Sequence, residues 1–233
     1  MSATKKNKNQ NQDQELKNVE NALSASEVFI EKYKNQILYV LGGVVLLILA
    51  VLAFRAWYIA PREEMAEDKI AICQEYFAKD SFQLALKGDG TDEFLGFENI
   101  AKEYKMTKIA NLASVYAGVC CYKLEQYENA INFLKKADFD SPNLGPAAIG
   151  LLGDCYVQLG DEKSALKYFE KAAKEENDLT APLYLKKAAT IYEKQGNYKK
   201  AVELYTVIKD KYFRSMQASD IDKYIERAKV LQQ

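Results

Sequence analysis

Apolar residues follow two different patterns along this chain. Eighteen consecutive residues, Ile37 to Phe54 (ILYVLGGVVLLILAVLAF), carry no charge, whereas beyond about residue 60 apolar residues recur every three or four positions among charged ones. The second pattern puts apolar side chains on one face of a helix and is typical of helices that pack against one another. The sequence therefore predicts one helix that is apolar on every face, followed by a body of packed helices.

The apolar run has the length of a membrane-spanning helix. With a rise of about 1.5 Å per residue it covers most of the roughly 30 Å hydrocarbon core of a bilayer, and residues 56–59 extend it. Tyr39 and Trp57 lie near its ends, where aromatic rings favour the membrane interface, and Pro61 is expected to close the helix. The run is longer than the apolar segment of a cleaved signal peptide, and residues 1–36 precede it. We therefore expect an uncleaved anchor.

Charges beside the run do not decide its orientation by themselves. The basic residues nearest the run number three on each side: Lys17, Lys32 and Lys34 before it, and Arg55, Arg62 and Lys69 after it. The six lysines in residues 1–36 and the acidic opening of the far side, with Glu63, Glu64, Glu67 and Asp68, favour a cytoplasmic N-terminus and a body outside the cytoplasm.

The segments flanking the run differ in character. Residues 1–23 are predicted to be a cytoplasmic head that starts polar and disordered and ends in an amphipathic stretch, which either contacts the membrane or a partner or is a solvated linker. Ser24 and Glu27 form a capping-box pattern, so residues 24–60 are expected to be a membrane-proximal and transmembrane helix. Residues 61–110 are expected to form a degenerate first helical repeat.

A Gly-Asp-Gly sequence interrupts this first repeat. It lies between two expected helices, Glu63 to Lys79 and Phe94 to Tyr104, and matches neither the P-loop pattern nor a calcium-binding loop. We therefore predict a turn in which Thr91 or Asp92 caps the following helix.

Residues 111–214 contain three copies of one plan. The copies are YKLEQYENAINFLKKADFDSP from Tyr122, YVQLGDEKSALKYFEKAAKEEND from Tyr156 and YEKQGNYKKAVELYTVIKDKYF from Tyr192. Equivalent positions form four columns: Gly118, Gly153 and Ala189; Ala130, Ala165 and Ala201; Leu134, Phe169 and Tyr205; Ala137, Ala172 and Ile208. The second column advances by 35 and then 36 residues. This period, with small residues where two helices must touch, resembles the tetratricopeptide repeat.

Stacking explains why the copies occur together. A single helix pair cannot bury its own apolar stripe, so neighbouring pairs complete a shared core. Residues 215–233 are expected to be a capping helix over the last repeat, with Ser219 and Asp222 as a capping box. The predicted fold class is all-α: a single transmembrane helix followed by a tetratricopeptide-repeat α-solenoid with a C-terminal capping helix.

The resemblance implies a partner-binding groove lined by the first helices of successive repeats. Positions spaced by three and four residues on these helices share one face, which is apolar and aromatic at its membrane-proximal end. The predicted groove residues are Leu112, Val115, Tyr116, Val119, Tyr122, Ala147, Leu151, Asp154, Val157 and Lys186. Two of the three repeats lack the Lys, Arg and Asn that would bind a C-terminal carboxylate, so we expect an apolar or amphipathic protein segment as ligand. Alternatively, the first repeat or another part of the same chain fills the groove.

Composition narrows the possible chemistry. The chain has 233 residues, 48% of them apolar and 28% charged, with a formal net charge of −1 and no histidine. The absence of the commonest general base and metal ligand argues against an enzyme or a metal centre, and we expect no cofactor. The small net charge does not favour nucleic acid. The four cysteines, Cys73, Cys120, Cys121 and Cys155, are interpreted as core residues, with a disulfide as the alternative.

The complete arrangement has a second resemblance. A short head, one spanning helix and a repeat body, together with the stretch GDGTDEFLGFENIAKEYKMTKIANLASVYAGVCCYKLEQYENAINFL, resemble the single-pass accessory subunit of the bacterial Sec translocon in its Bacteroidetes form. The resemblance implies an inner-membrane protein with a periplasmic body. It also implies translocon channel subunits and a membrane-anchored periplasmic chaperone or prolyl isomerase as partners.

The leading functional hypothesis is therefore a non-enzymatic, chaperone-like scaffold that binds partners or exported clients at the translocon. The alternative is a scaffold of another cell-envelope complex, in outer-membrane assembly, secretion or division.

Overall fold

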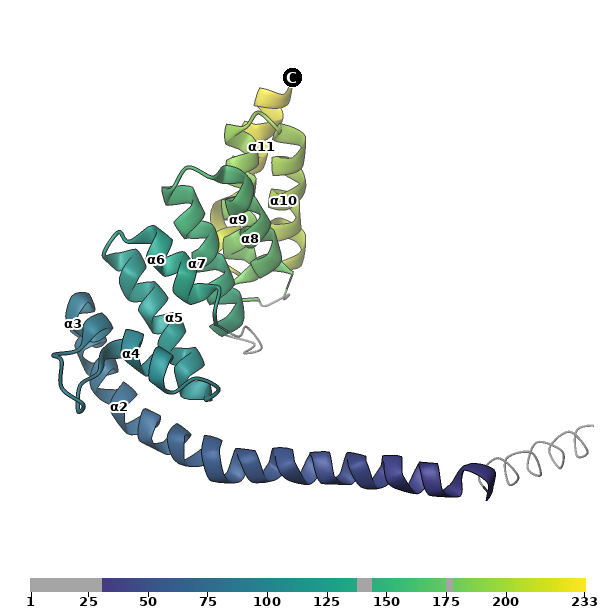
Figure 1. Ribbon diagram of the computed structural model, residues 1–233. Coiled ribbons are helices and arrows are strands. Elements are labelled where there is room, and N and C mark those ends of the chain that lie inside the picture. Colours follow the sequence, from purple (N-terminus) through teal and green to yellow (C-terminus); the bar gives the residue numbers. More distant parts are fainter. Residues whose placement is uncertain (1–30, 138–143, 175–177) are drawn as a thin grey trace, which may run out of the picture. The chain divides into compact units, whose positions relative to one another are not determined.

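The computed structural model describes residues 31–137, 144–174 and 178–233, and the regular elements in these ranges are all helical (Figure 1). The chain divides into two compact units, Met1–Tyr58 and Ile59–Gln233. The division falls within a π-helical turn, η1 (Arg55–Ile59). The predicted head and the predicted helix start at Ser24 lie outside the described residues.

One helix is long and apolar enough, by length and composition, to cross a membrane. It runs from Glu31 to Ala78, and none of its most apolar 18-residue window is buried inside the protein. Large apolar side chains point outward all along this window: Leu38 is 64% exposed and Leu46 is 69% exposed. A helix that is apolar on every face has the pattern expected of a membrane-spanning helix or of a helix buried by other protein.

The expectation that Pro61 closes this helix is wrong. Pro61 lies in the first turn of α2 (Ala60–Ala78), which continues the helix after η1. Proline has no N–H to donate, and its ring normally interferes with the regular hydrogen bonds of the preceding helical turn. The wider π-turn before it changes the hydrogen-bond register, so the chain remains helical through the proline.

Three helices occupy the segment that was predicted to be a degenerate first repeat: α2, α3 (Phe82–Lys87) and α4 (Gly96–Glu103). The short α3 was not predicted. Neither Thr91 nor Asp92 caps α4, because the helix begins only at Gly96, and the Thr91 hydroxyl instead accepts from the Phe94 N–H. In the turn, the backbone at Gly88 and the backbone at Gly96 lie in close contact. A Cβ added to Gly88 would lie 2.0 Å from Phe94 O, and a Cβ added to Gly96 would lie 2.3 Å from Gly88 N. Only glycine allows such an approach.

Three helix pairs follow in the order that the sequence columns predict. They are α5 (Lys108–Lys123) with α6 (Tyr127–Leu134), α7 (Leu144–Gln158) with α8 (Glu162–Ala173), and α9 (Ala181–Lys194) with α10 (Tyr198–Lys211). Each pair packs on the next (Figure 1). The first-column glycines give the close approach: a Cβ on Gly118 would lie 2.6 Å from Leu134, and one on Gly153 would lie 2.5 Å from Phe169.

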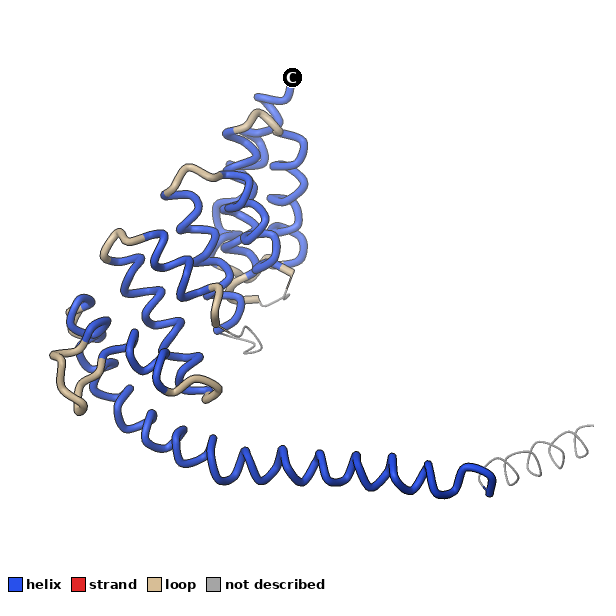
Figure 2. The backbone as a smooth tube through the Cα atoms, viewed as in Figure 1, coloured by secondary structure: helices blue, strands red, loops and turns tan. Residues whose placement is uncertain are grey.

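The connecting turns lie on two opposite edges of the stack (Figure 2). Turns within a repeat have a left-handed residue at one position: Glu125 (φ 60°), Gly160 (φ 75°) and Gly196 (φ 75°). The next helix then starts on a side-chain cap in two of the three repeats, where Asp161 accepts from the Ser164 N–H and Asn197 accepts from the Lys200 N–H. The described turn between α4 and α5 lies on the other edge (Figure 2).

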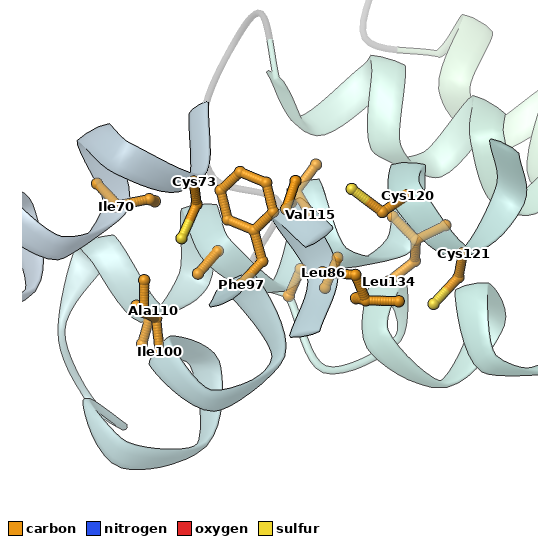
Figure 3. Packing of buried hydrophobic residues seen from close by; sticks show 14 of the residues in the cluster. Ile70, Cys73, Leu86, Phe97, Ile100, Ala110, Val115, Cys120, Cys121 and Leu134 are labelled. Carbon is orange, nitrogen blue, oxygen red and sulfur yellow. The ribbon is translucent and has the colours of Figure 1, made fainter. Parts of the chain in front are cut away.

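The core of the first repeats is continuous. Phe97 from α4 and Leu86 from α3 lie close to Val115 and Leu134, so α2–α4 share one hydrophobic cluster with the pair α5–α6 (Figure 3). Further clusters form between α8 and α9 and around α10. This sharing of apolar surface between neighbours is what the stack requires for stability.

A C-terminal helix covers the last pair. In α11 (Ile221–Gln232) the side chains of Ile221, Ile225 and Ala228 are buried against the stack. The predicted capping box is wrong, because a 3₁₀ turn, η2 (Met216–Asp220), precedes α11 and contains Ser219. The Ser219 hydroxyl donates to the Met216 carbonyl, and Ser215 instead caps η2 by accepting from the Ala218 N–H.

Candidate functional site

The predicted groove residues lie on the first helices α5, α7 and α9, with differing exposure. Val115 is buried at 5% exposure, and Val157 is exposed at 42%. The others are half-buried: Leu112, Tyr116, Val119, Tyr122, Ala147, Leu151, Asp154 and Lys186. The row is therefore neither fully open nor fully closed, and its neighbours decide which part can contact a ligand.

The α2–α4 end of the row is covered by the protein itself. The ring of Tyr116 stacks on Phe97 of α4 with centroids 4.9 Å apart and meets Phe77 of α2 edge-on at 5.1 Å. Val115 is buried in the same cluster. The alternative in which the first repeat occupies the groove therefore describes this end of the row.

In the middle of the row a charge pair lies between two repeats. The carboxylate of Asp154 on α7 accepts from Lys187 Nζ on α9 at 2.6 and 2.7 Å. Burial raises the pKa of Tyr122, and the negative charge of Asp154 raises it further. The ring of Tyr122 also contacts the ring of Tyr127, with centroids 5.7 Å apart. Asp154 therefore links α7 of one repeat to α9 of the next.

Gly150, which lies between the predicted groove residues Ala147 and Leu151 on α7, is buried under an aromatic ring. An added Cβ would lie 1.9 Å from Cζ of Tyr184, whose hydroxyl donates to the Ala147 carbonyl at 3.3 Å. Burial raises the pKa of Tyr184 to about 12. Here the space that a partner would need is filled by the next repeat.

The far end of the row is bound to the C-terminal helix. Lys186 Nζ donates to Asp220 at 2.7 Å and lies 4.2 Å from the centre of the Tyr224 ring. Two turns further along α9, the carboxylate of Glu193 accepts two hydrogen bonds from the Arg227 guanidinium, at 2.7 and 2.8 Å. The positive charge predicted for this part of the groove is therefore used within the chain.

These contacts leave a central strip as the best candidate for contact with a partner. It consists of Val119, Tyr122, Leu151 and Val157 on α5 and α7. Its apolar and aromatic side chains can bind another apolar segment by dispersion and burial of surface, and its polar groups are too few to form a catalytic cluster. Among the described residues there is no group of three or more potential metal ligands.

The repeat body also contains a hollow that the sequence did not predict. It has a volume of about 820 Å³ and includes none of the ten predicted groove residues. Its lining comes from the turn before α5, from the first turns of α5 and from the ends of α4 and α6: Ala101, Lys102, Lys105, Met106, Thr107, Lys108, Ala110, Asn111, Ser114, Phe133 and Lys136. The lysine-rich sequence Lys105 to Lys108 was visible in the chain, but its proximity to Lys136 depends on the packing of two repeats.

The four cysteines are free and buried. Burial raises the pKa of Cys73 and Cys121 to about 11 and that of Cys120 and Cys155 to about 12, so the thiols remain protonated at neutral pH. Their surroundings are those of core side chains, as interpreted from the sequence.

Comparison with known proteins defines the class of the body. Residues 122–188 match one tetratricopeptide-repeat family model and residues 185–209 match a second, so this part of the chain is built from tetratricopeptide repeats. The crystal structure of MamA protein aligns with 72% of this chain and 92% of its own at 17% sequence identity, with a TM-score of 0.51, and so shares the fold. A search of curated proteins gave no match.

Proposed function

We propose that this protein is a non-enzymatic scaffold that a single transmembrane helix anchors in a membrane and whose repeat body binds protein partners. The observation that carries the proposal is the pairing of two features in one chain: a stack of tetratricopeptide repeats and an apolar helix without protein cover. The binding surface is the central strip, Val119, Tyr122, Leu151 and Val157.

The partner is an apolar or amphipathic protein segment. The α2–α4 end of the groove is filled by Tyr116 and its aromatic neighbours, and the far end is held by Lys186 and Asp220. A ligand is therefore confined to the strip between them. Carboxylate recognition would require free cations there, and Lys187 is engaged with Asp154.

The more specific proposal places the protein in the bacterial inner membrane as an accessory subunit of the Sec translocon. Its N-terminus is cytoplasmic, its body is periplasmic, and it holds channel subunits, a membrane-anchored periplasmic chaperone or prolyl isomerase, or exported clients close to the translocation site. The resemblance of residues 88–134 to such subunits and the acidic start of the body support this assignment.

Affinity purification of the full chain from its native membrane in mild detergent tests the assignment. Recovery of translocon channel subunits is the expected result. Recovery of an outer-membrane assembly, secretion or division complex without channel subunits would replace it with the alternative scaffold. Protease added to intact spheroplasts should remove the body, and its full protection would contradict the periplasmic location.

A pair of matched variants tests the binding strip. Val157→Asp places a charge on the strip, whereas Val230→Asp makes the same change on α11 at a site that is 67% exposed. Partner recovery should fall with Val157→Asp and stay at the wild-type level with Val230→Asp, while the circular dichroism of both variants matches wild type. Equal recovery with both would show that partners bind elsewhere.

A further inference from the structure

The turn between α4 and α5 is fixed against the first turn of α2. The guanidinium of Arg62 donates to the Glu103 carbonyl and lies 5.3 Å from the centre of the Tyr104 ring. The carboxylate of Glu63 accepts from the backbone N–H groups of Lys108 and Ile109 at 2.9 and 3.1 Å. Glu63 thereby caps α5 from a helix more than forty residues away in the sequence.

The start of α2 lies close to the end of the apolar sequence. Ile59 is the last residue of the apolar extension, and Arg62 follows it by three residues, which is about 5 Å along a helix axis. The headgroup layer outside the hydrocarbon core is about 5–7 Å thick on each side of a bilayer. If the apolar helix spans the membrane and ends near Ile59, Arg62 follows that end within about 5 Å, and the turn that Arg62 and Glu63 contact lies close to the same point.

The turn presents one apolar side chain between cations. Met106 is 71% exposed, and the exposed residues Lys105 and Lys108 flank it. Met106 also has a φ of 72°, in the left-handed region that residues other than glycine rarely adopt. The turn therefore exposes a long apolar side chain next to two cations.

The charged side chains that line the hollow beside the turn are all lysines, although the carboxylate of Glu63 also lies at the turn. The hollow beside it is lined by Lys102, Lys105, Lys108 and Lys136 and includes no acidic side chain, although Lys102 also pairs with Glu98. Lysine clusters near a bilayer attract anionic lipids, and an unbranched apolar side chain between them can enter the interface.

We propose that the turn from Lys105 to Lys108 is a lipid-contact site, in which Met106 enters the headgroup interface and the surrounding lysines pair with phosphates of anionic phospholipids. The proposal rests on the membrane anchoring proposed above. It gives the body a second contact with the bilayer, which restricts how freely the binding strip moves relative to the membrane surface.

Site-directed fluorescence tests this contact in the full chain. The native cysteines are all buried, at 1% exposure or less, so Met106→Cys provides a selective site for a nitrobenzoxadiazole label. The labelled protein is reconstituted into phosphatidylcholine vesicles containing phosphatidylglycerol, with headgroup spin-labelled lipid as quencher. Leu159→Cys is the control, because it is 41% exposed and lies in the turn between α7 and α8 on the opposite edge (Figure 2).

The expected result is strong quenching of the label at position 106 and little at position 159. Adding Lys105→Gln and Lys108→Gln should reduce the quenching at position 106 in anionic vesicles and change it little in pure phosphatidylcholine. The circular dichroism of each variant confirms that it folds. Equal quenching at positions 106 and 159 would overturn the proposal, and so would quenching at position 106 that the lysine substitutions leave unchanged.

Trp57 separates this proposal from the one on which it depends. It is the single tryptophan of the chain, and it lies at the end of the apolar run. Quenching of Trp57 without quenching at position 106 would refute the lipid contact and retain the anchor. An unquenched Trp57 would refute the anchor itself. Crosslinking of position 106 to a protein in native membranes, without lipid quenching, would show that the occupant is a protein and the lipid assignment wrong.

Discussion

Gly150 is the position at which a single methyl group is expected to test the stacking of two repeats. The substitution Gly150→Ala places a Cβ 1.9 Å from Cζ of Tyr184, a ring that is only 5% exposed and stacks on Phe169 with centroids 6.0 Å apart. The ring therefore cannot move aside freely. Adjustment would also disturb the hydrogen bond from the Tyr184 hydroxyl to the Ala147 carbonyl.

Three terms determine the magnitude. Overpacking a close-packed core costs about 1–3 kcal/mol, and loss of the hydrogen bond costs about 1 kcal/mol more. Alanine in place of glycine inside a helix contributes about 1 kcal/mol in the opposite direction. We expect a net destabilisation of about 1–3 kcal/mol. In a body of this size each kcal/mol lowers the melting temperature by about 2–4 °C.

Thermal unfolding of the full chain in detergent, followed by circular dichroism at a helical wavelength, measures the effect. The control is the same substitution in a Tyr184→Ala background, where the obstructing ring is absent and only the helix preference remains. Gly150→Ala should then raise the melting temperature. A wild-type or higher melting temperature for Gly150→Ala alone would refute the packing of Tyr184 on Gly150.

Three further predictions follow from particular contacts. Glu63→Ala removes the acceptor of two N–H groups at the start of α5 and should lower the free energy of unfolding by about 1–2 kcal/mol in denaturant titration, whereas Glu64→Ala, an exposed neighbour, should stay within about 0.5 kcal/mol of wild type. At Glu98, partial burial acts to raise the pKa, but bonds to Lys102 and Lys87 outweigh it and hold the pKa below its ordinary value. Its stabilisation is therefore present above the unfolded-state pKa and lost as the pH falls through the folded one, so Glu98→Gln should lose less stability than wild type between about pH 5 and pH 3. The four buried thiols should resist a thiol reagent at about pH 8 in the folded protein and react after unfolding, and rapid reaction of the native protein would contradict their burial.

The sequence was sufficient for the repeated helix pairs because their determinants are local and periodic. Gly118 and Gly153 recur at the positions where Leu134 and Phe169 approach, and a residue larger than glycine at either position would separate the helices. The long apolar run was equally clear, since length and the absence of charge are properties of the chain alone. The capping errors at Thr91 and Ser219 have a common cause: a cap depends on where the preceding turn ends, which propensity does not fix.

Only the tertiary structure determined which parts of the predicted groove are open and which are filled by the chain itself. The sequence placed Tyr116, Asp154 and Lys186 on the predicted groove face, but each is engaged by a different neighbour: Phe97, Lys187 and Asp220. Periodicity indicates which face of a helix a residue occupies, and it contains no information about which distant side chain fills the space opposite. For the same reason the sequence showed Glu63 only as one of several acidic residues after the apolar run. Packing brings its carboxylate to two N–H groups at the start of α5, and it brings a lysine-flanked methionine to the start of α2.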